Sequence, residues 1–142
     1  MIAMSKSTPS DPFRAAAEAG DVEALVATLA PDVVLHSPVT FHPYVGRETV
    51  GGILRFVSDA LAGWRCIDEL PAPGGLHGLV FAACVGDREI EGLDLLNTGA
   101  GGLITELTVM IRPLSGLIAL AEAIGPRVEA AGVTPSPDVS ED

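Results

Sequence analysis

Apolar residues recur every three or four positions in several stretches of the chain, which is the period of an α-helix. The pattern predicts four helices: 13–19, 22–29, 47–62 and a last one from about Leu114 or Ser115 to Val128. Asp21 is placed to cap the second helix, and Pro31 is placed to end it. Gly125 and Pro126 are expected to kink the last helix.

Between these helices, alternating or continuous apolar runs predict strands. The expected strands are 33–36, 64–70, 77–85, 88–96 and 103–112, with a loop over 40–45. Gly86-Asp87 is a two-residue hairpin signal between two of them. N-terminal helices, an antiparallel meander and a packing helix indicate an α+β domain. Because Gly92 can let a strand bend, we expect a strongly curved sheet with helices across its open face.

The length of 142 residues fits one domain. We expect that domain to span 11–132, with a disordered segment at 1–10 and a disordered acidic tail at 133–142, which is rich in Pro and Ser. With 48% hydrophobic residues and a mean hydropathy of +0.41, the chain is too apolar to be disordered as a whole. No apolar run is long enough to suggest a membrane span, and no signal peptide is apparent, so we expect a cytoplasmic protein.

Eight basic and nineteen acidic residues give a net charge of −11. Such an acidic surface repels nucleic acids and anionic membranes, so neither is an expected partner. Cys66 and Cys84 lie outside any CxxC or Cys/His cluster, and the three histidines lack metal-site spacing. We therefore expect no metal and no cofactor. We expect both cysteines to be reduced thiols in the core, because a disulfide would require an oxidising compartment.

Three stretches carry a resemblance to a known family: AAAEAGDVEALVATLAPDVVLHSPV, VGRETV and EGLDLLNTGAGGLITELTVMIRP. Together with the order of helices and strands, they resemble the NTF2-like superfamily, which includes ketosteroid isomerases and SnoaL-like polyketide cyclases. The resemblance covers roughly residues 13–131. It implies a cone-shaped fold, the cystatin-like roll, in which helices and sheet surround an apolar pocket for a small molecule. The fold alone does not fix a reaction, because it hosts many functions.

The polar residues of the ketosteroid isomerases can be compared position by position. Phe13 stands where that family has a tyrosine, and Ser37 stands where it has the aspartate that acts as base. Asp94 stands eight residues before Gly102, which matches the protonated aspartate of the family. The resemblance therefore implies that this chain keeps one of the family's three polar site residues, the aspartate at position 94. Members that resemble limonene-epoxide hydrolases need an arginine where this chain has Gly92, so that chemistry is not expected.

Asp94 is the candidate catalytic residue. Alternation along its strand places Ile90, Asp94 and Leu96 on one face, and Glu89 and Glu91 on the other. The two glutamates mark the solvent side, so Asp94 is expected to point into the apolar cavity. Desolvation there would raise the pKa of its carboxyl and let it donate a proton or a hydrogen bond. A purely structural hydrogen bond is the alternative.

The remaining candidates are expected to bind substrate. They are Phe13, Ser37, Tyr44, Trp64, Leu107, Val109 and Ile111. The last three match pocket-wall positions of the isomerases and equally fit a filled core. Ser37 lies in no G-x-S-x-G motif, so a pocket hydroxyl or a local turn bond is favoured over a nucleophile. His36 and His42 lie near the same loop, where a histidine can act as a general base, although alternation turns His36 outwards.

Three functions remain open at this point. The first is a cofactor-independent isomerase- or cyclase-like enzyme that transfers protons on a steroid-like or polyketide-like carbonyl compound. The second is a non-catalytic module that binds an apolar molecule, and the third is a structural dimerising domain. A homodimer is expected through the outer face of the sheet, because strand 103–112 is apolar on both faces. Leu103, Val109 and Ile111 are expected on the inner face, and Ile104, Thr108 and Met110 on the outer one.

Overall fold

The structure is a computed structural model that describes residues 11–137. Its helices are α1 (Asp11–Ala19), α2 (Val22–Ala27), α3 (Arg47–Ala60) and α4 (Leu114–Ala130). Its strands are β1 (Leu29–His36), β2 (Tyr44–Val45), β3 (Leu61–Pro71), β4 (Leu76–Val85), β5 (Arg88–Thr98) and β6 (Ile104–Arg112). The sequence prediction for residues 1–10 lies outside the described residues.

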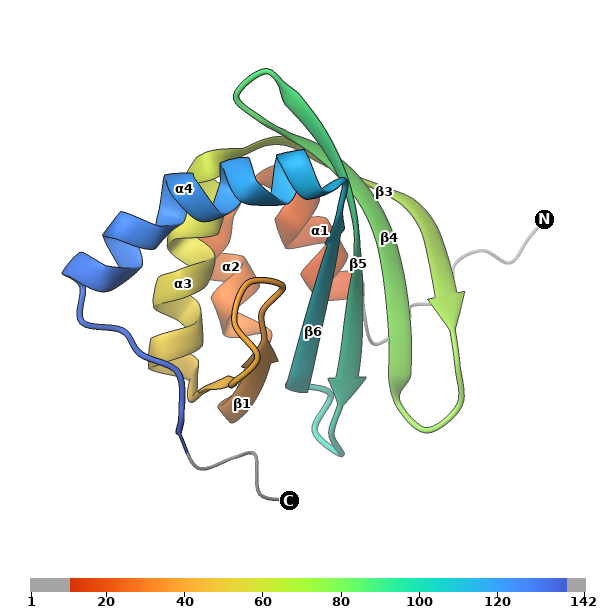
Figure 1. Ribbon diagram of the computed structural model, residues 1–142. Coiled ribbons are helices and arrows are strands. Elements are labelled where there is room, and N and C mark those ends of the chain that lie inside the picture. The colour runs from red at the N-terminus through yellow and green to blue at the C-terminus, as the bar shows by residue number, and fades with distance from the viewer. Residues whose placement is uncertain (1–10, 138–142) are drawn as a thin grey trace.

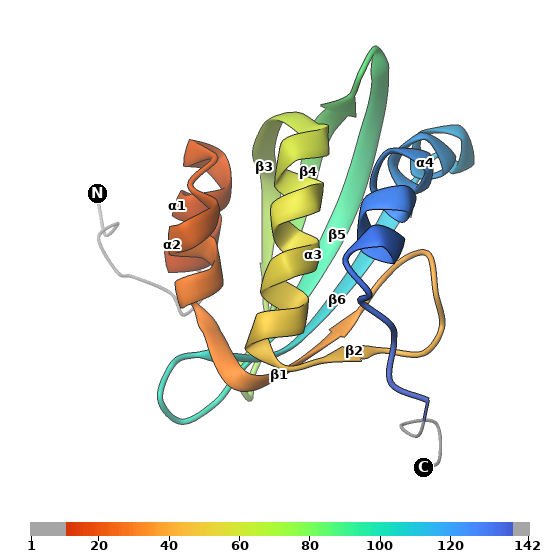
Figure 2. The same ribbon diagram turned by 90° about the vertical axis from the view of Figure 1, so that its left-hand side faces the viewer.

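The strands form one mixed sheet in the order β2-β1-β6-β5-β4-β3. Strands β3 to β6 make the expected antiparallel meander, and β1 joins it by pairing in parallel with β6. The sheet curves around α3, while α1 and α2 lie beside one end of it and α4 beside the other (Figures 1 and 2). The α+β cone inferred from the sequence is confirmed.

The core lies on the concave face of the sheet. Its fully buried side chains come from β1, α3 and β4 to β6, and they include Leu29, Val50, Leu79, Leu96 and Leu107. A second cluster, around Phe81 and Ile90, packs under α4. Helix α3 contributes the apolar face that its three-and-four spacing predicts. Within the described part of the chain, no helix is long and apolar enough to cross a membrane.

The second helix is shorter than its pattern predicts. It ends at Ala27, and Leu29 and Pro31 belong to β1 instead. The Thr28 hydroxyl donates to the carbonyl of Leu25 at 2.6 Å, and the Arg47 guanidinium donates twice to the carbonyl of Leu29, at 2.7 and 3.0 Å. The helix ends before Leu29. This apolar residue stands at helical spacing, but its side chain is buried as part of β1.

Two further boundaries differ from the sequence prediction. The third helix ends at Ala60 rather than at 62, and the next residues, Gly63 with φ +68° included, belong to β3. The segment 40–45 is not all loop, because Tyr44 and Val45 pair with β1. Both differences arise from strand pairing, which a local apolar pattern does not report.

Ile104 was expected on the outer face of the sheet and is instead buried, with 1% of its surface exposed. Asn97 pairs with Glu106, whereas Thr98 pairs with Ile104, so Thr105 is an extra residue in β6. One extra residue reverses the side to which the preceding side chain points. Ile104 therefore shares the inner face with Leu107.

Residues 133–137 pack against the domain, which the composition of this segment does not suggest. Val133 packs against the core, and the amide of Ser136 donates to the carbonyl of Pro43 at 2.7 Å. The segment thus runs from the end of α4 down to the loop before β2 (Figure 2). The remainder of the expected disordered tail, 138–142, lies outside the described residues.

Candidate functional site

A cavity of about 850 Å³ lies between the concave face of the sheet and helices α1, α3 and α4. This volume is in the usual range for small-molecule sites. The wall includes all eight residues predicted to catalyse or to bind substrate: Phe13, Ser37, Tyr44, Trp64, Asp94, Leu107, Val109 and Ile111. The fold therefore brings residues from α1, β2, β3, β5 and β6, together with the loop after β1, to one place.

Asp94 lies in the middle of β5 and lines the cavity. Its neighbours across the sheet are Leu79 on β4 and Val109 on β6. The residue is 6% exposed, and its carboxyl has no hydrogen-bond or ion-pair partner among residues 11–137. Burial raises the pKa of Asp94 from 3.8 to about 7. Near neutral pH this carboxyl is divided between a form that donates a proton and a form that accepts one.

The wall beside Asp94 is aromatic. The indole of Trp64 stacks on the ring of Phe81, with centroids 5.3 Å apart and planes 20° from parallel. Phe81 lies opposite Gly92, and a Cβ atom on Gly92 would stand 2.3 Å from its Cζ. The glycine leaves the space that the phenyl ring occupies, so it shapes this wall in addition to any effect on sheet curvature.

Ser37 lines the cavity, but its hydroxyl is engaged in the turn after β1. Its Oγ accepts from the amides of Val39 and Thr40, at 3.2 and 3.1 Å, and lies 3.3 Å from Oγ1 of Thr40. This is the turn bonding typical of serine. No histidine or carboxylate is hydrogen-bonded to this hydroxyl in the described structure, so Ser37 has no activating base.

Tyr44 is the second buried polar residue of the cavity wall. It is 7% exposed and lies opposite Leu35, whose side chain is also on the inner face. Its hydroxyl has no hydrogen-bond partner among residues 11–137, but it is not one of the atoms sealed from solvent. Solvent therefore reaches this hydroxyl, and water can bond to it.

His77 is a buried polar residue that the sequence analysis did not single out. It lies on β4 opposite Leu96, is 5% exposed, and does not line the cavity. Its Nε2 is the one sealed side-chain nitrogen or oxygen without a hydrogen bond in the described part of the chain. His77, Leu79 and Phe81 stand two residues apart on one strand, so their side chains share a face. The sequence alone therefore predicts that His77 points inward.

The other two histidines lie away from the cavity wall. His36 points to the outer face, where its Nε2 lies 2.7 Å from Oε2 of Glu106. His42 contacts Phe41 edge-to-face in the loop before β2, and Phe41 is 87% exposed. Neither histidine lines the cavity, so neither is placed as a base for a ligand inside it.

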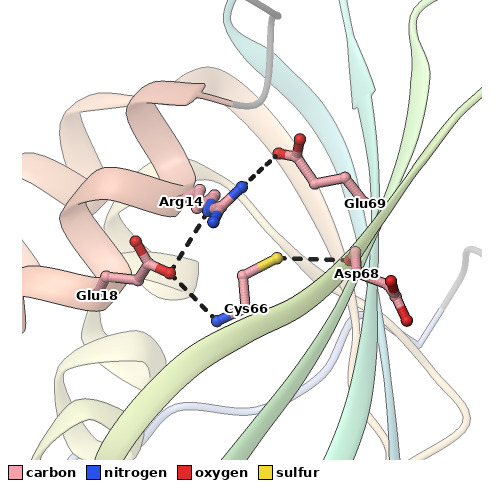
Figure 3. Close-up of polar contacts among 5 residues, drawn as sticks. All are labelled: Arg14, Glu18, Cys66, Asp68 and Glu69. Atoms are coloured by element: carbon pink, nitrogen blue, oxygen red, sulfur yellow. Dashed lines mark hydrogen bonds and ion pairs between the residues drawn. The ribbon is translucent and has the colours of Figure 1, made fainter.

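A polar cluster ties α1 to the edge strand β3 at one rim of the cavity (Figure 3). Arg14 pairs with Glu18 at 3.4 Å and with Glu69 at 3.5 Å, and Glu18 accepts from the amide of Cys66 at 3.2 Å. Burial raises the pKa of the Cys66 thiol, although nearby Arg14 opposes this. Cys66 is therefore a neutral thiol and a poor nucleophile. No group of residues within 11–137 is arranged to hold a metal ion.

Comparison with known proteins matches residues 12–70 to a family described as the SnoaL-like domain. A crystal structure of a steroid delta-isomerase from Pseudomonas aeruginosa is 30% identical, with a TM-score of 0.79, and the match covers 93% of this chain and 100% of that one. A protein with a cystatin-like fold from Silicibacter pomeroyi is 27% identical, with a TM-score of 0.80 and 87% of each chain covered.

A more distant structure, an NTF-2 like protein of unknown function from Burkholderia xenovorans, is 18% identical, with a TM-score of 0.62. That match covers 72% of this chain and 79% of the other, and it bears on the fold alone. No curated protein matches the sequence.

Proposed function

The chain belongs to the NTF2-like superfamily and carries a SnoaL-like domain, and from this premise we propose that its cavity binds a neutral, largely apolar carbonyl compound. The observation that supports this most is the carboxyl of Asp94, which lies in an apolar wall without a partner among residues 11–137. In its protonated form it donates a hydrogen bond to a carbonyl oxygen.

The charges around the cavity favour a neutral ligand over an anion. No lysine, arginine or histidine lines the described part of the wall, whereas Glu18 and Glu129 do. A carboxylate or phosphate ligand would meet Glu129 and the net charge of −11 with no cation in the described wall to compensate, because Arg14 beside Glu18 is already paired with Glu18 and Glu69.

We further propose that Asp94 transfers a proton on the bound compound, as an isomerase- or cyclase-like enzyme would require. The ionised carboxylate removes a proton from the carbon beside the carbonyl, and the C–H electron pair moves into an enolate. The carboxyl then returns the proton to another position, which leaves the enzyme unchanged and needs no cofactor. The relative named as a steroid delta-isomerase supports this class of reaction.

Two positions make such catalysis slow. Phe13 has no hydroxyl to stabilise an oxyanion, and Ser37 has no charge with which to accept a proton. Asp94 would have to serve as base and as oxyanion partner, and one carboxyl cannot do both at once. The absence of a separate positioned base should reduce turnover by about 10²- to 10⁴-fold. The second candidate function, a binding protein without turnover, rests on the same two positions.

Calorimetry with a matched pair of ligands tests the binding proposal. We expect androst-4-en-3-one to bind at pH 6, and its 17-carboxylate analogue to bind at least about tenfold more weakly. Tighter binding of the carboxylate would contradict a neutral-ligand site.

Turnover is tested with androst-5-ene-3,17-dione, by following absorbance at the conjugated enone band. We expect slow conversion that Asp94→Asn abolishes. Binding without conversion would support the non-catalytic alternative.

We also propose a homodimer through the outer face of the sheet. Leu93 and Met110 pair there, and a shallow groove of about 290 Å³ runs beside them. Met110 is 51% exposed, and Leu70 on the same sheet is 50% exposed, so both leave apolar surface open to a partner. A second copy of this chain would cover both.

Light scattering is expected to give the dimer mass for the parent protein and the monomer mass for Met110→Lys. Leu114→Lys is the matched control, because Leu114 is 70% exposed on α4 and not on the sheet. The control should remain dimeric. A monomeric parent at micromolar concentration would refute the proposal.

A further inference from the structure

The segment that follows α4 forms part of the cavity wall, although it belongs to no helix or strand. Gly132, Val133 and Thr134 all line the cavity, and the chain then runs towards the loop before β2 (Figure 2). We call residues 132–137 the strap. Gly132 and Thr134 line the cavity and are also exposed to solvent, so no further layer of the described protein covers the strap on its outer side.

The end of α4 sets the direction in which the strap leaves the helix. The amide of Val133 donates to the carbonyl of Val128 at 3.2 Å, and the amide of Gly132 donates to the carbonyl of Glu129 at 3.0 Å. These two bonds form a Schellman motif, in which a glycine with positive φ reverses the chain, and Gly132 has φ +72°. Val133 and Val128 both pack against the core. The helix end therefore turns the strap back towards the cavity.

Beyond Val133, one hydrogen bond joins the strap to the rest of the described chain. The amide of Ser136 donates to the carbonyl of Pro43 at 2.7 Å. Pro135 and Pro137 have no amide hydrogen, so Ser136 supplies the single donor between them. The two prolines also stiffen this stretch, which lowers the entropy that it loses on docking. The strap is therefore ordered but held by few contacts.

The bond between Ser136 and Pro43 connects two parts of the cavity wall. Pro43 ends the loop after β1, in which Ser37 and Thr40 line the cavity. The turn bonds of Ser37 stiffen this loop, so it offers the strap a fixed point. With the bond intact, α4, the strap and the loop form a continuous wall. With the bond broken, the strap swings about the end of α4 and leaves a gap between the helix and the loop.

A second exposed rim of the cavity, beside α1, is held more firmly. Two polar contacts cross from α1 to β3 there: Arg14 pairs with Glu69 at 3.5 Å, and Glu18 accepts from the amide of Cys66 at 3.2 Å (Figure 3). The same helix is anchored by Phe13, which is 4% exposed. Opening this rim would expose that side chain, whereas releasing the strap beyond Val133 breaks one hydrogen bond. The strap is therefore the part of the wall that opens at the lower cost.

We propose that the strap is a gate, which admits a ligand to the cavity when the bond between Ser136 and Pro43 breaks. One opening serves both directions, so a gate changes the association and dissociation rates by the same factor and leaves the dissociation constant unchanged. A strap that only contributed contacts to the ligand would change the dissociation rate alone. The gate concerns access and not chemistry, so it does not depend on the carbonyl compound or the proton transfer proposed above.

Stopped-flow fluorescence with N-phenyl-1-naphthylamine, a neutral dye that brightens in apolar surroundings, measures both rates. Ser136→Pro removes the donating amide. Association and dissociation should each become about fivefold faster, which is the worth of one net hydrogen bond. A chain that ends at Val133 lacks the bond altogether and should be at least as fast. Ser136→Ala keeps the amide and is the matched control for the substitution, and a chain that ends at Pro137 is the control for the truncation. Both controls should match the parent.

Circular dichroism establishes that each variant is folded, and if one of the two released variants is not, the other carries the comparison. Rates equal to the parent's, or a faster dissociation alone, would mean that the strap is a fixed wall. Arg14→Gln loosens the rim beside α1, and if it accelerates exchange more than Ser136→Pro does, the entrance lies there and the strap is not the gate. Dye that enters neither the parent nor the released variants has the same meaning. Dye that enters only the released variants would show a gate that closes completely.

Discussion

Asp94→Asn is expected to be about 4 kcal/mol more stable than the parent protein at pH 8. Burial raises the pKa of Asp94 from 3.8 to about 7, a change of about three units at about 1.4 kcal/mol each. Because the folded pKa lies above the unfolded one, the penalty is absent below pH 4 and grows as the pH rises towards 7. Asparagine has nearly the same shape and no charge, so it avoids the penalty.

Urea unfolding of both proteins at pH 4 and pH 8 measures this effect. The two should agree within about 1 kcal/mol at pH 4, since both side chains are then neutral. Asp32→Asn is the control, because Asp32 is exposed and the substitution should change stability by less than about 0.5 kcal/mol at either pH. If Asp94→Asn is less stable than the parent at pH 8, the carboxylate is ionised and paired, and its acid role is wrong.

Gly92→Ala is expected to reduce the free energy of unfolding by about 3 kcal/mol. The new Cβ would lie 2.3 Å from Cζ of Phe81 and 2.8 Å from the carbonyl oxygen of Met110. Both distances are far below ordinary contact. The carbonyl belongs to the neighbouring strand, so it cannot move without disturbing the sheet. Thermal or denaturant unfolding measures the loss.

A second substitution separates the clash with the ring from a general effect of the new methyl group. Phe81→Leu removes the atoms that Cβ meets, so the double variant should lose at least about 1 kcal/mol less than the sum of the single losses. Gly52→Ala is the control. It lies in α3 with nothing within 4 Å of the new Cβ, so it should be neutral or stabilising. Additive losses would mean that Phe81 is not the obstacle.

The order of helices and strands and the inward direction of Asp94 followed from the sequence because they depend on short periods. Alternation along β5 needs only neighbouring residues, and Glu89 and Glu91 mark the solvent side. Leu29 and Ile104 were misplaced because strand pairing decides both. Arg47, eighteen residues away, holds the carbonyl of Leu29, and the extra residue Thr105 turns Ile104 inward.

The sequence also does not predict which hydroxyl groups of the site are already hydrogen-bonded. Whether a hydroxyl is already bonded depends on the turn or strand that surrounds it. Ser37 and Tyr44 are both expected pocket residues, yet the first is occupied by its own turn and the second is left without a partner in the described structure. No pattern of residue types separates these two cases, because the difference lies in the backbone amides that surround each side chain.

The stacked pair of Trp64 and Phe81 has a practical consequence for the study of this protein. Trp64 is the single tryptophan of the chain and forms part of the cavity wall. Indole fluorescence responds to the polarity of its surroundings, so a ligand that replaces water beside Trp64 changes the emission of the whole protein. The molecule thus carries an intrinsic optical reporter of occupancy, with no competing indole elsewhere and no need for a label.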